Sequence, residues 1–327
     1  MPPSCLGREG GASEGLEAEE LDLVSFWKGR SEGILNTKKR ETARALLFAL
    51  LVGMGVVLFS GAIVALLTVS KNKELYSHIP VIPFVSLYFL VARGKGIFTE
   101  AAWNPLKGFP VMACALVTLW LSACLEGQLH PQDYLSLMMT GLFLWLVGAF
   151  VFSYGAQASR RAAFPLLFLL FIIPIPTLIL EPFIHSLQVG STEFAHAVFK
   201  LTGVPLHRDG FLFSLPGLTI EVAEQCSGIR SSIALVITGI LMAKLFLRKA
   251  GLRAVLILSV LPVTMFKNAL RIVMLALLGA YVDPRFITGS WLHRSGGIPF
   301  FVVGLLLLLL VLWGLRKLER KPGQENR

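Results

Sequence analysis

The chain has 327 residues, of which 55% are hydrophobic and only 15% are charged. A soluble domain carries roughly a quarter charged residues, so this composition excludes an ordinary soluble protein. The net charge of +10 would suit a nucleic-acid-binding protein, but the Lys and Arg residues cluster in short loops between apolar runs, as membrane orientation requires. The sequence therefore predicts an all-α integral membrane protein that does not bind nucleic acid.

The first forty-odd residues differ from the rest of the chain in composition. They begin Gly- and Glu-rich ("GREGGASEGLEAEELDL") and end close to the basic "NTKKR". Such a segment has too little apolar surface to fold alone, so residues 1–43 are predicted to be a disordered cytoplasmic leader. No signal peptide precedes the first apolar run, so the first span should be retained. Residues 44–315 are the predicted membrane domain, and 316–327 a basic cytoplasmic tail.

The membrane domain contains apolar runs of about the 20 residues that a membrane-spanning helix needs. The second run is broken by Pro80 and Pro83, so it is expected to be tilted or partly re-entrant. The seventh contains Pro262, where a kink is expected. About eight transmembrane helices are predicted, near 44–69, 79–93, 108–125, 134–155, 162–180, 228–247, 252–282 and 297–315.

The loops between these runs predict an orientation. "NTKKRETAR", "ARGKG", "QASRR", "LFLRKAGLR" and "GLRKLERK" are basic and fall on one side of an eight-span arrangement; only "SKNKELYSH" runs mildly against the pattern. The positive-inside rule then places both termini in the cytoplasm and the protein in the cell (inner) membrane.

The longest outer loop, 181–227, should have structure of its own. Glu181–Lys200 has helical apolar spacing, which predicts a helix lying at the interface. The segment "VPLHRDGFLFSLPGLTIEV" contains the turn pairs Asp209-Gly210 and Pro216-Gly217 between short β-prone runs. A small β-meander is the expected structure.

The stretch "EVAEQCSGIRSS" brings the chain to the sixth span and carries Cys226. A helix N-terminus lowers the pKa of a nearby thiol and so favours a nucleophile. Ser227 is placed to cap that helix, and Gly228 would let another backbone approach closely. The alternative, that Cys226 is a buried small hydrophobe, stays open on these residues alone.

The seventh span contains "FKNALRIVMLALLGAY", which places Lys267, Asn268 and Arg271 in an apolar run. Charges inside a membrane are costly and usually functional. Lys267 and Arg271 are four residues apart and therefore share one helix face. The alternative is a structural Arg271 paired with Glu221 or Glu224.

His293, in "WLHRSGGIPFF", precedes the eighth span on the same predicted outer side. A Cys thiolate attacks an acyl carbon, a His moves protons, and an Arg donates to the oxyanion. Glu224 either tunes the thiol or holds Arg230. Neither HExxH, a phosphate loop nor a metal-ligand spacing is present, so we expect no metal and no cofactor.

With these residues in place, the chain resembles the exosortase/archaeosortase family of polytopic cysteine transpeptidases. The resemblance implies Cys226 as the nucleophile, Arg271 as the electrophilic Arg and His293 as the acid/base. One departure is "YSHIP", where many members have Gly after the His. The matching segments are "YSHIPVIPFVSLYFL", "FPLLFLLFIIPIP", "VAEQCSGIRSS", "NALRI" and "HRSGGIPFF".

The resemblance also implies the substrates. They would be secreted proteins with a C-terminal sorting signal, made of a Pro-containing motif, a membrane span and a basic cluster. The chain would be passed to a cell-surface or extracellular acceptor, such as an exopolysaccharide or a lipid-linked group, with membrane lipid as the surrounding partner. Two alternatives remain: a transporter or flippase for an anionic lipid or sugar, with Lys267 and Arg271 lining the path, and an assembly subunit of exopolysaccharide export with an unused site.

Overall fold

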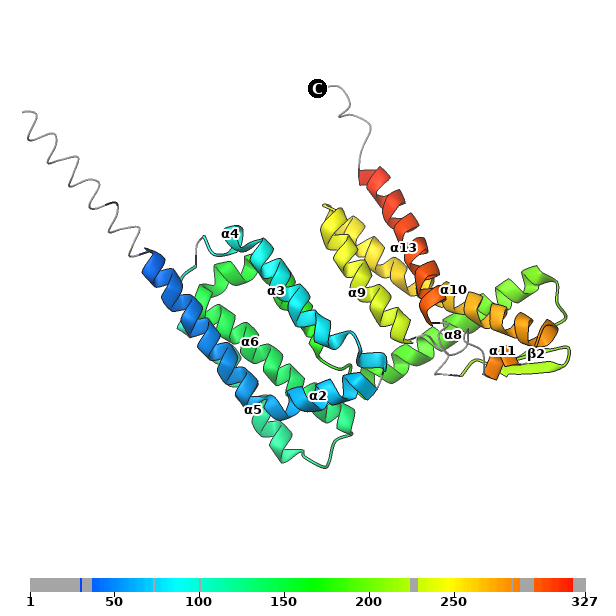
Figure 1. Cartoon of the computed structure of the whole chain (residues 1–327), viewed down its shortest axis with the longest axis horizontal. Coiled ribbons are helices and arrows are strands. Elements are labelled where there is room, and N and C mark those ends of the chain that lie inside the picture. The colour runs from blue at the N-terminus through cyan, green and yellow to red at the C-terminus, as the bar shows by residue number, and fades with distance from the viewer. Residues whose placement is uncertain are drawn as a thin grey trace, which may run out of the picture. The chain divides into compact units, whose positions relative to one another are not determined.

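The computed structural model describes residues 30, 37–72, 74–99, 101–223, 229–283, 285–288 and 297–319. The chain divides into two compact units, which are treated one at a time (Figure 1). Unit 1 comprises Met1–Val64, Ile82–Leu129 and Leu137–Ile173, and unit 2 comprises Ala65–Val81, His130–Ser136 and Pro174–Arg327.

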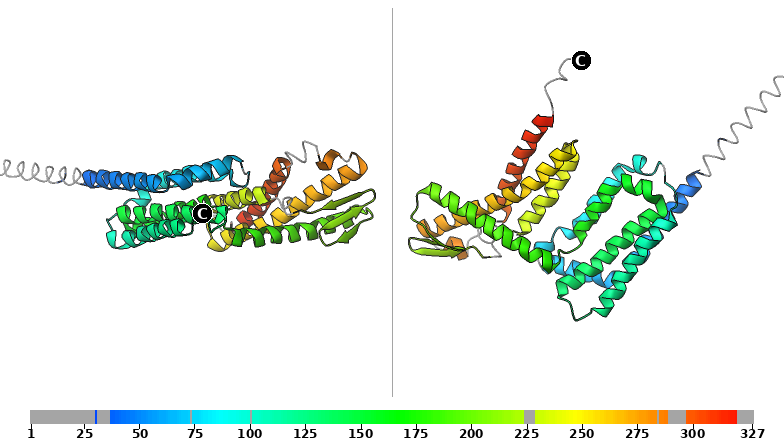
Figure 2. Two further views of the ribbon diagram at one scale, coloured as in Figure 1. Left: turned by 90° about the horizontal axis from the view of Figure 1, so that it is seen from below. Right: turned by 180° about the vertical axis from the view of Figure 1, so that it is seen from behind.

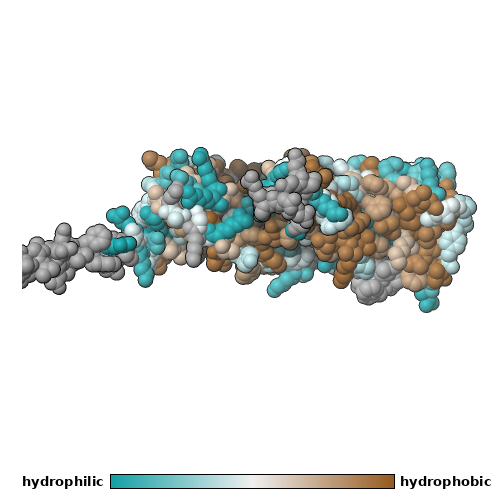
Figure 3. Space-filling model, turned by 90° about the horizontal axis from the view of Figure 1, so that it is seen from above, coloured by the Kyte–Doolittle hydropathy of each residue, from teal (hydrophilic) through white to brown (hydrophobic). Residues whose placement is uncertain are grey.

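The predicted class, a mostly helical membrane protein with a small sheet, is confirmed. In the described part of the chain, six helices are long and apolar enough to cross a membrane, or seven if Ala163–Ile172 and Thr177–Thr202 form one broken span. The six are Thr37–Leu58, Pro105–Cys124, Pro131–Arg161, Ile229–Phe246, Ala250–Tyr281 and Ile298–Glu319. Large apolar side chains such as Leu106, 87% exposed, stand on the surface, as the brown areas of Figure 3 illustrate. Apolar surface of this extent suits contact with lipid.

The count of about eight spans differs from the six at the predicted second and fifth spans, and the fifth, 162–180, falls on the bent pair Ala163–Ile172 and Thr177–Thr202. The predicted second span is the short helix α3, Ile82–Ala92, preceded by the 3₁₀ turn Ile79–Val81. Pro80 and Pro83 lack the N–H that a longer α-helix would need there. The predicted first span is interrupted by a turn at Phe59, so that Thr37–Leu58 is followed by a separate helix, α2. This first helix already includes residues 37–43.

Unit 1 is built around the long helix α6. Gly108 of α5 lets that helix approach closely, because a Cβ there would lie 2.5 Å from the backbone of Phe152. Trp145 of α6 donates its indole N–H to the Leu51 carbonyl at 2.8 Å. The elements that lie in or enter this unit are Thr37–Leu58, α2 (Ser60–Asn72), α3 (Ile82–Ala92), α4 (Gly94–Ile97), α5 (Pro105–Cys124), α6 (Pro131–Arg161), α7 (Ala163–Phe168) and η3 (Leu169–Ile172).

Unit 2 is organised around α10, which packs against α8, α9 and α13. Its predicted kink site, Pro262, lies inside α10, which is assigned as one helix over its whole length. The elements of this unit are η1 (Glu74–Tyr76), η2 (Ile79–Val81), α8 (Thr177–Thr202), β1 (His207–Asp209), β2 (Leu212–Leu215), β3 (Leu218–Glu221), α9 (Ile229–Phe246), α10 (Ala250–Tyr281), α11 (Arg285–Thr288) and α13 (Gly297–Glu319).

The predicted helix at Glu181–Lys200 is present as part of the longer α8. Its first turn is capped by Asp133, whose carboxylate accepts the backbone N–H of Thr177 at 2.7 Å and its hydroxyl at 2.6 Å. A carboxylate at a helix N-terminus satisfies a free donor and complements the helix dipole. The helix ends at Thr202, and Gly203, which follows it as the C-cap, has φ of 70°.

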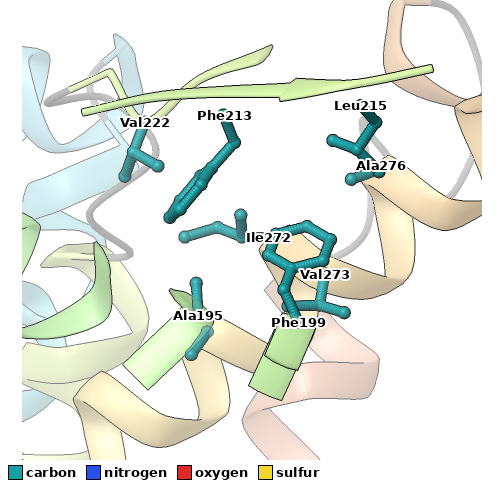
Figure 4. Close-up of a cluster of buried hydrophobic side chains, with 9 residues drawn as sticks. Ala195, Phe199, Phe213, Leu215, Val222, Ile272, Val273 and Ala276 are labelled. Carbon is teal, nitrogen blue, oxygen red and sulfur yellow. The ribbon is translucent and has the colours of Figure 1, made fainter. Parts of the chain in front are cut away.

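The predicted β-meander is also confirmed. The three strands pair antiparallel in the order β1-β2-β3, and the turns between them contain Gly210 and Gly217, both with positive φ. The sheet runs along α8 and α10 (Figure 2). One face of it buries Phe213 and Leu215 against these helices, together with Phe199 and Ile272 (Figure 4).

Candidate active site

The structure describes four of the nine predicted site residues: Arg230, Lys267, Asn268 and Arg271. The other five, Glu224, Cys226, Ser227, Gly228 and His293, lie outside the described residues. The site is therefore built from the elements on either side of them, all of which belong to unit 2.

The helices α9, α10 and α13 form a bundle whose relative register is fixed by close contacts. A Cβ on Gly304 of α13 would meet side chains of α9 and α10, and a Cβ on Gly239 of α9 would meet side chains of α10 and α13. At the far end, Glu319 accepts backbone N–H groups of the α9–α10 turn. These contacts define three heights along the bundle, and the residues that meet at each height are Leu235, Lys267 and Gly304; Gly239, Val260 and Leu308; and Arg248, Lys249 and Glu319.

This register shows that α10 runs antiparallel to both neighbours, because residue numbers fall along α10 as they rise along α9 and α13. Arg271 lies four residues beyond Lys267, about 6 Å along the helix axis. In the same direction α9 begins at Ile229 and α13 at Gly297. The start of α9 and the start of α13 are thus on the side of Lys267 where Arg271 lies.

Lys267 is among the most deeply buried side chains of the chain, at 2% exposure. Its ammonium donates to the hydroxyl of Ser231 in the first turn of α9. Its aliphatic stem packs beside Gly304, where a Cβ would lie 3.3 Å from Lys267 Cδ. The Lys267 side chain therefore links the start of α9 to α10, and the absence of a side chain at Gly304 leaves space for its aliphatic part.

The neighbours of Lys267 on α10 differ in exposure. Asn268 is 1% exposed, whereas Arg271 is only partly buried. Arg271 precedes Ile272 and Val273, which pack under the sheet in Figure 4. Arg230, in the first turn of α9, is exposed.

The sheet fixes the chain on the other side of the undescribed segment 224–228. After β3, Val222 is 1% exposed and donates its N–H to the Phe211 carbonyl at 3.0 Å. Its carbonyl accepts the side-chain amide of Gln188, from α8, at 2.6 Å. The backbone is thus held at Val222, four residues before Cys226 and seven before α9 begins.

Gln188 was not singled out from the sequence, although a signal for it exists. Gln188, Ser191 and Thr192 are polar, are spaced three and four residues apart, and are all at most 5% exposed. This spacing puts them on one helix face. A buried polar face on a helix of a membrane protein indicates contact with protein, since polar groups facing lipid are costly.

The segment "YSHIP" adds a buried tyrosine beside α9 and a half-buried histidine two residues later. Tyr76 of η1, 3% exposed, lies in an element that contacts α9, and burial, with a smaller effect of Asp133, raises the pKa of Tyr76 to about 12. Burial also lowers the pKa of His78. Both side chains therefore carry no charge at neutral pH.

Outside the bundle, an ion pair ties the sheet to α8. Arg208 of β1 donates to both carboxylate oxygens of Glu193, at 2.6 and 3.1 Å. These hydrogen bonds raise the pKa of the Arg208 guanidinium. Glu221, considered above as a partner for Arg271, ends β3 with an exposed side chain.

The comparisons with known proteins give one match. The family model described as transmembrane exosortase matches residues 69–310, which is well over half of the 327-residue chain. No curated protein and no solved structure gives a significant match. The matched range includes every segment on which the resemblance was based. The chain therefore belongs to the transmembrane exosortase family.

Proposed function

We propose that this chain is a membrane cysteine endopeptidase and transpeptidase that cleaves the C-terminal sorting signal of secreted proteins. The observation that carries the proposal is the register of α9, α10 and α13. It puts Arg271, the start of α9 and the start of α13 on the same side of Lys267. In the sequence, Cys226 precedes the start of α9 by three residues and His293 precedes the start of α13 by four.

The chemistry follows from the residue types. The Cys226 thiolate attacks the scissile carbonyl carbon, and Arg271 donates to the oxyanion that forms. The C–N bond then breaks, the leaving amine takes a proton from His293, and a thioester remains on Cys226. An acceptor amine, or water, gives a proton to His293 as it attacks the thioester; the C–S bond breaks, which releases the product and restores the Cys226 thiolate.

Two further features support this assignment. The segment 224–228 is bounded by Val222, whose carbonyl Gln188 holds, and by the first turn of α9, which Lys267 holds. The proposed site faces the outer side of the membrane, close to the bilayer surface, which suits a peptide bond just outside a substrate's own membrane span.

A reporter fused to a sorting signal tests the proposal directly. Wild type and Cys226→Ala are each co-expressed with the reporter, whose size is followed by immunoblot. Cys114→Ala and Cys124→Ala are matched controls, because these two thiols are exposed on α5 in unit 1. We expect cleavage in wild type and in both controls and none in Cys226→Ala. Cleavage that persists in Cys226→Ala would remove the nucleophile assignment.

The transporter alternative is less well supported by the geometry. Lys267 is 2% exposed and hydrogen-bonded to Ser231, so its ammonium does not line an open path in this conformation. In the assembly-subunit alternative the site is unused. Both alternatives predict that Cys226→Ala leaves polysaccharide export intact, so an export assay on the same variant separates them from the protease.

A further inference from the structure

The bundle of unit 2 gathers positive charge at the end opposite the proposed active site. The end of α9, the start of α10 and the end of α13 meet there, since Glu319 accepts the backbone N–H groups of Arg248 and Lys249 at 2.9 and 2.7 Å. Glu319 is the one acidic residue in the segments 244–253 and 309–319. The basic residues of these segments are Lys244, Arg248, Lys249, Arg253, Arg316 and Lys317.

A pocket of about 370 Å³ lies on α13 beside this cluster. Of its lining residues, Arg316 and Lys317 lie nearest the C-terminal end of α13, and Leu309, Leu312 and Trp313 precede them. From Leu309 to Lys317 the lining covers about 12 Å of helix at 1.5 Å per residue. The pocket is therefore cationic at one end and apolar along the rest.

The two cations are positioned by aromatic rings. Lys317 Nζ lies 3.7 Å from the centre of the Trp313 ring, and Arg316 Cζ lies 5.7 Å from the centre of the Phe246 ring. Within the described part of the chain, neither side chain donates a hydrogen bond or forms an ion pair. Stacking holds a guanidinium or ammonium in place while leaving its N–H donors available for an anion.

We propose that this pocket binds one anionic phospholipid, with the lipid phosphate on Arg316 and Lys317 and an acyl chain along Leu309, Leu312 and Trp313. The charge selects an anionic head group, because each basic residue near a membrane surface attracts anionic lipid. The apolar wall selects a lipid over free phosphate, since burying hydrocarbon there stabilises only a ligand that carries a chain. Tryptophan at the junction is typical of the level of lipid head groups.

Quenching of Trp313 measures this binding in the intact protein. The full chain is purified in a zwitterionic detergent and titrated with brominated phosphatidylglycerol or brominated phosphatidylcholine. Trp313→Phe gives the quenching that comes from the other tryptophans and is subtracted. We expect the Trp313 signal to be quenched by the anionic lipid at much lower concentration than by the zwitterionic one.

Charge variants separate this pocket from general attraction. The double variant Arg316→Gln/Lys317→Gln should need about 30-fold more phosphatidylglycerol, from roughly fivefold for each charge removed. Lys38→Gln/Lys39→Gln removes the same charge from exposed positions of the first helix and should bind as wild type does. Arg316→Lys/Lys317→Arg changes the same two positions but keeps the charge, and it should retain binding. Retained binding would show that the loss in the Gln variant comes from the removed charge and not from misfolding.

Several results would overturn the proposal. Equal quenching by the two lipids would show that the pocket does not select charge. An equal loss in the Lys38/Lys39 control would show diffuse attraction in place of a site. Displacement of the brominated lipid by inorganic phosphate at the same concentration would assign the cations to a soluble anion. None of these results depends on whether the chain cleaves peptides.

Discussion

Two buried polar residues of unit 2 each join two elements of the bundle or the sheet. Lys267 links α10 to α9 through Ser231, and Gln188 links α8 to the end of the sheet through Val222. In an apolar interior such a group is stable only when it is hydrogen-bonded. The two pairs lie on either side of the segment 224–228 along the chain.

Lys267→Met tests whether the buried cation serves function at the expense of stability. Methionine keeps most of the volume and removes the charge, a change that is often neutral or stabilising for a buried ion. We expect an unchanged or higher unfolding midpoint, together with at least about tenfold slower reporter cleavage, because a cation beside α9 favours the thiolate. Lys71→Met, at an exposed position of α2, should change neither quantity. Full cleavage by Lys267→Met would restrict Lys267 to a structural role.

Gln188→Leu tests the anchor at Val222. Leucine is similar in size but leaves the buried Val222 carbonyl without its donor, which costs about 1–3 kcal/mol. We expect a lower unfolding midpoint and faster hydrogen–deuterium exchange in the peptide that contains Val222. The matched control is Gln128→Leu, which removes an exposed hydrogen bond to the Cys124 carbonyl and should have little effect. Unchanged exchange at Val222 in Gln188→Leu would contradict the anchoring role.

At the scale of elements, close approach of helices depends on small residues at defined places. Gly304 of α13 faces Leu235 of α9 and Lys267 of α10, and a Cβ there would lie 2.8 Å from Leu235 Cδ1. Small residues let transmembrane helices pack tightly in the absence of a hydrophobic driving force between them. Gly314, on the same helix, has nothing within 4 Å of the place where its Cβ would be.

Gly304→Leu and Gly314→Leu are therefore a matched pair. The first forces α13 away from α9 and α10, and overpacking of this kind costs about 1–3 kcal/mol. The second meets open space and should be neutral or slightly stabilising, because leucine is a better helix former than glycine. Thermal unfolding of the two purified variants measures the difference. Equal midpoints would show that the tight contact at Gly304 does not limit packing.

At the scale of the whole molecule, the register of unit 2 supports part of the predicted orientation. The basic loops "LFLRKAGLR" and "GLRKLERK" were assigned to one side of the membrane, and Glu319 bonds directly to the turn between α9 and α10. The turn at Gly210, in the sheet, belongs to the end of the bundle where Arg271 lies, because the sheet packs on Ile272 and Val273.

Reporter fusions test which side is cytoplasmic. Alkaline phosphatase folds only outside the cytoplasm, so we expect it to be inactive when fused after Arg327 and active when inserted at Gly210. A fluorescent protein that folds only inside should behave in the opposite way at the C-terminus. We expect this orientation because the short loops on the same side as the C-terminus have an excess of Lys and Arg, and loops of this kind stay in the cytoplasm. An active phosphatase after Arg327 would reverse the orientation.

The sequence determined the membrane class, the β-meander and the family. It did so because hydropathy, turn pairs such as Asp209-Gly210 and ordered polar motifs are local signals. It was less exact for the number of spans, since the apolar runs near Pro83 and after Ile172 are divided by backbone geometry that hydropathy does not record. The site residues that the sequence singled out fall into two groups: Lys267, Asn268, Arg271 and Arg230 are placed by the structure, and the remaining five stay predictions.

Only the tertiary structure decided which helix faces meet. Lipid and protein interior are similarly apolar, so an apolar run does not reveal whether its neighbour is lipid or another helix. The contacts of Lys267 with Ser231 and of Gln188 with Val222 join residues 36 and 34 positions apart, and no local pattern specifies such a pairing. The register of α9, α10 and α13, from which the proposed site follows, arises from side-chain fit at glycines such as Gly239 and Gly304.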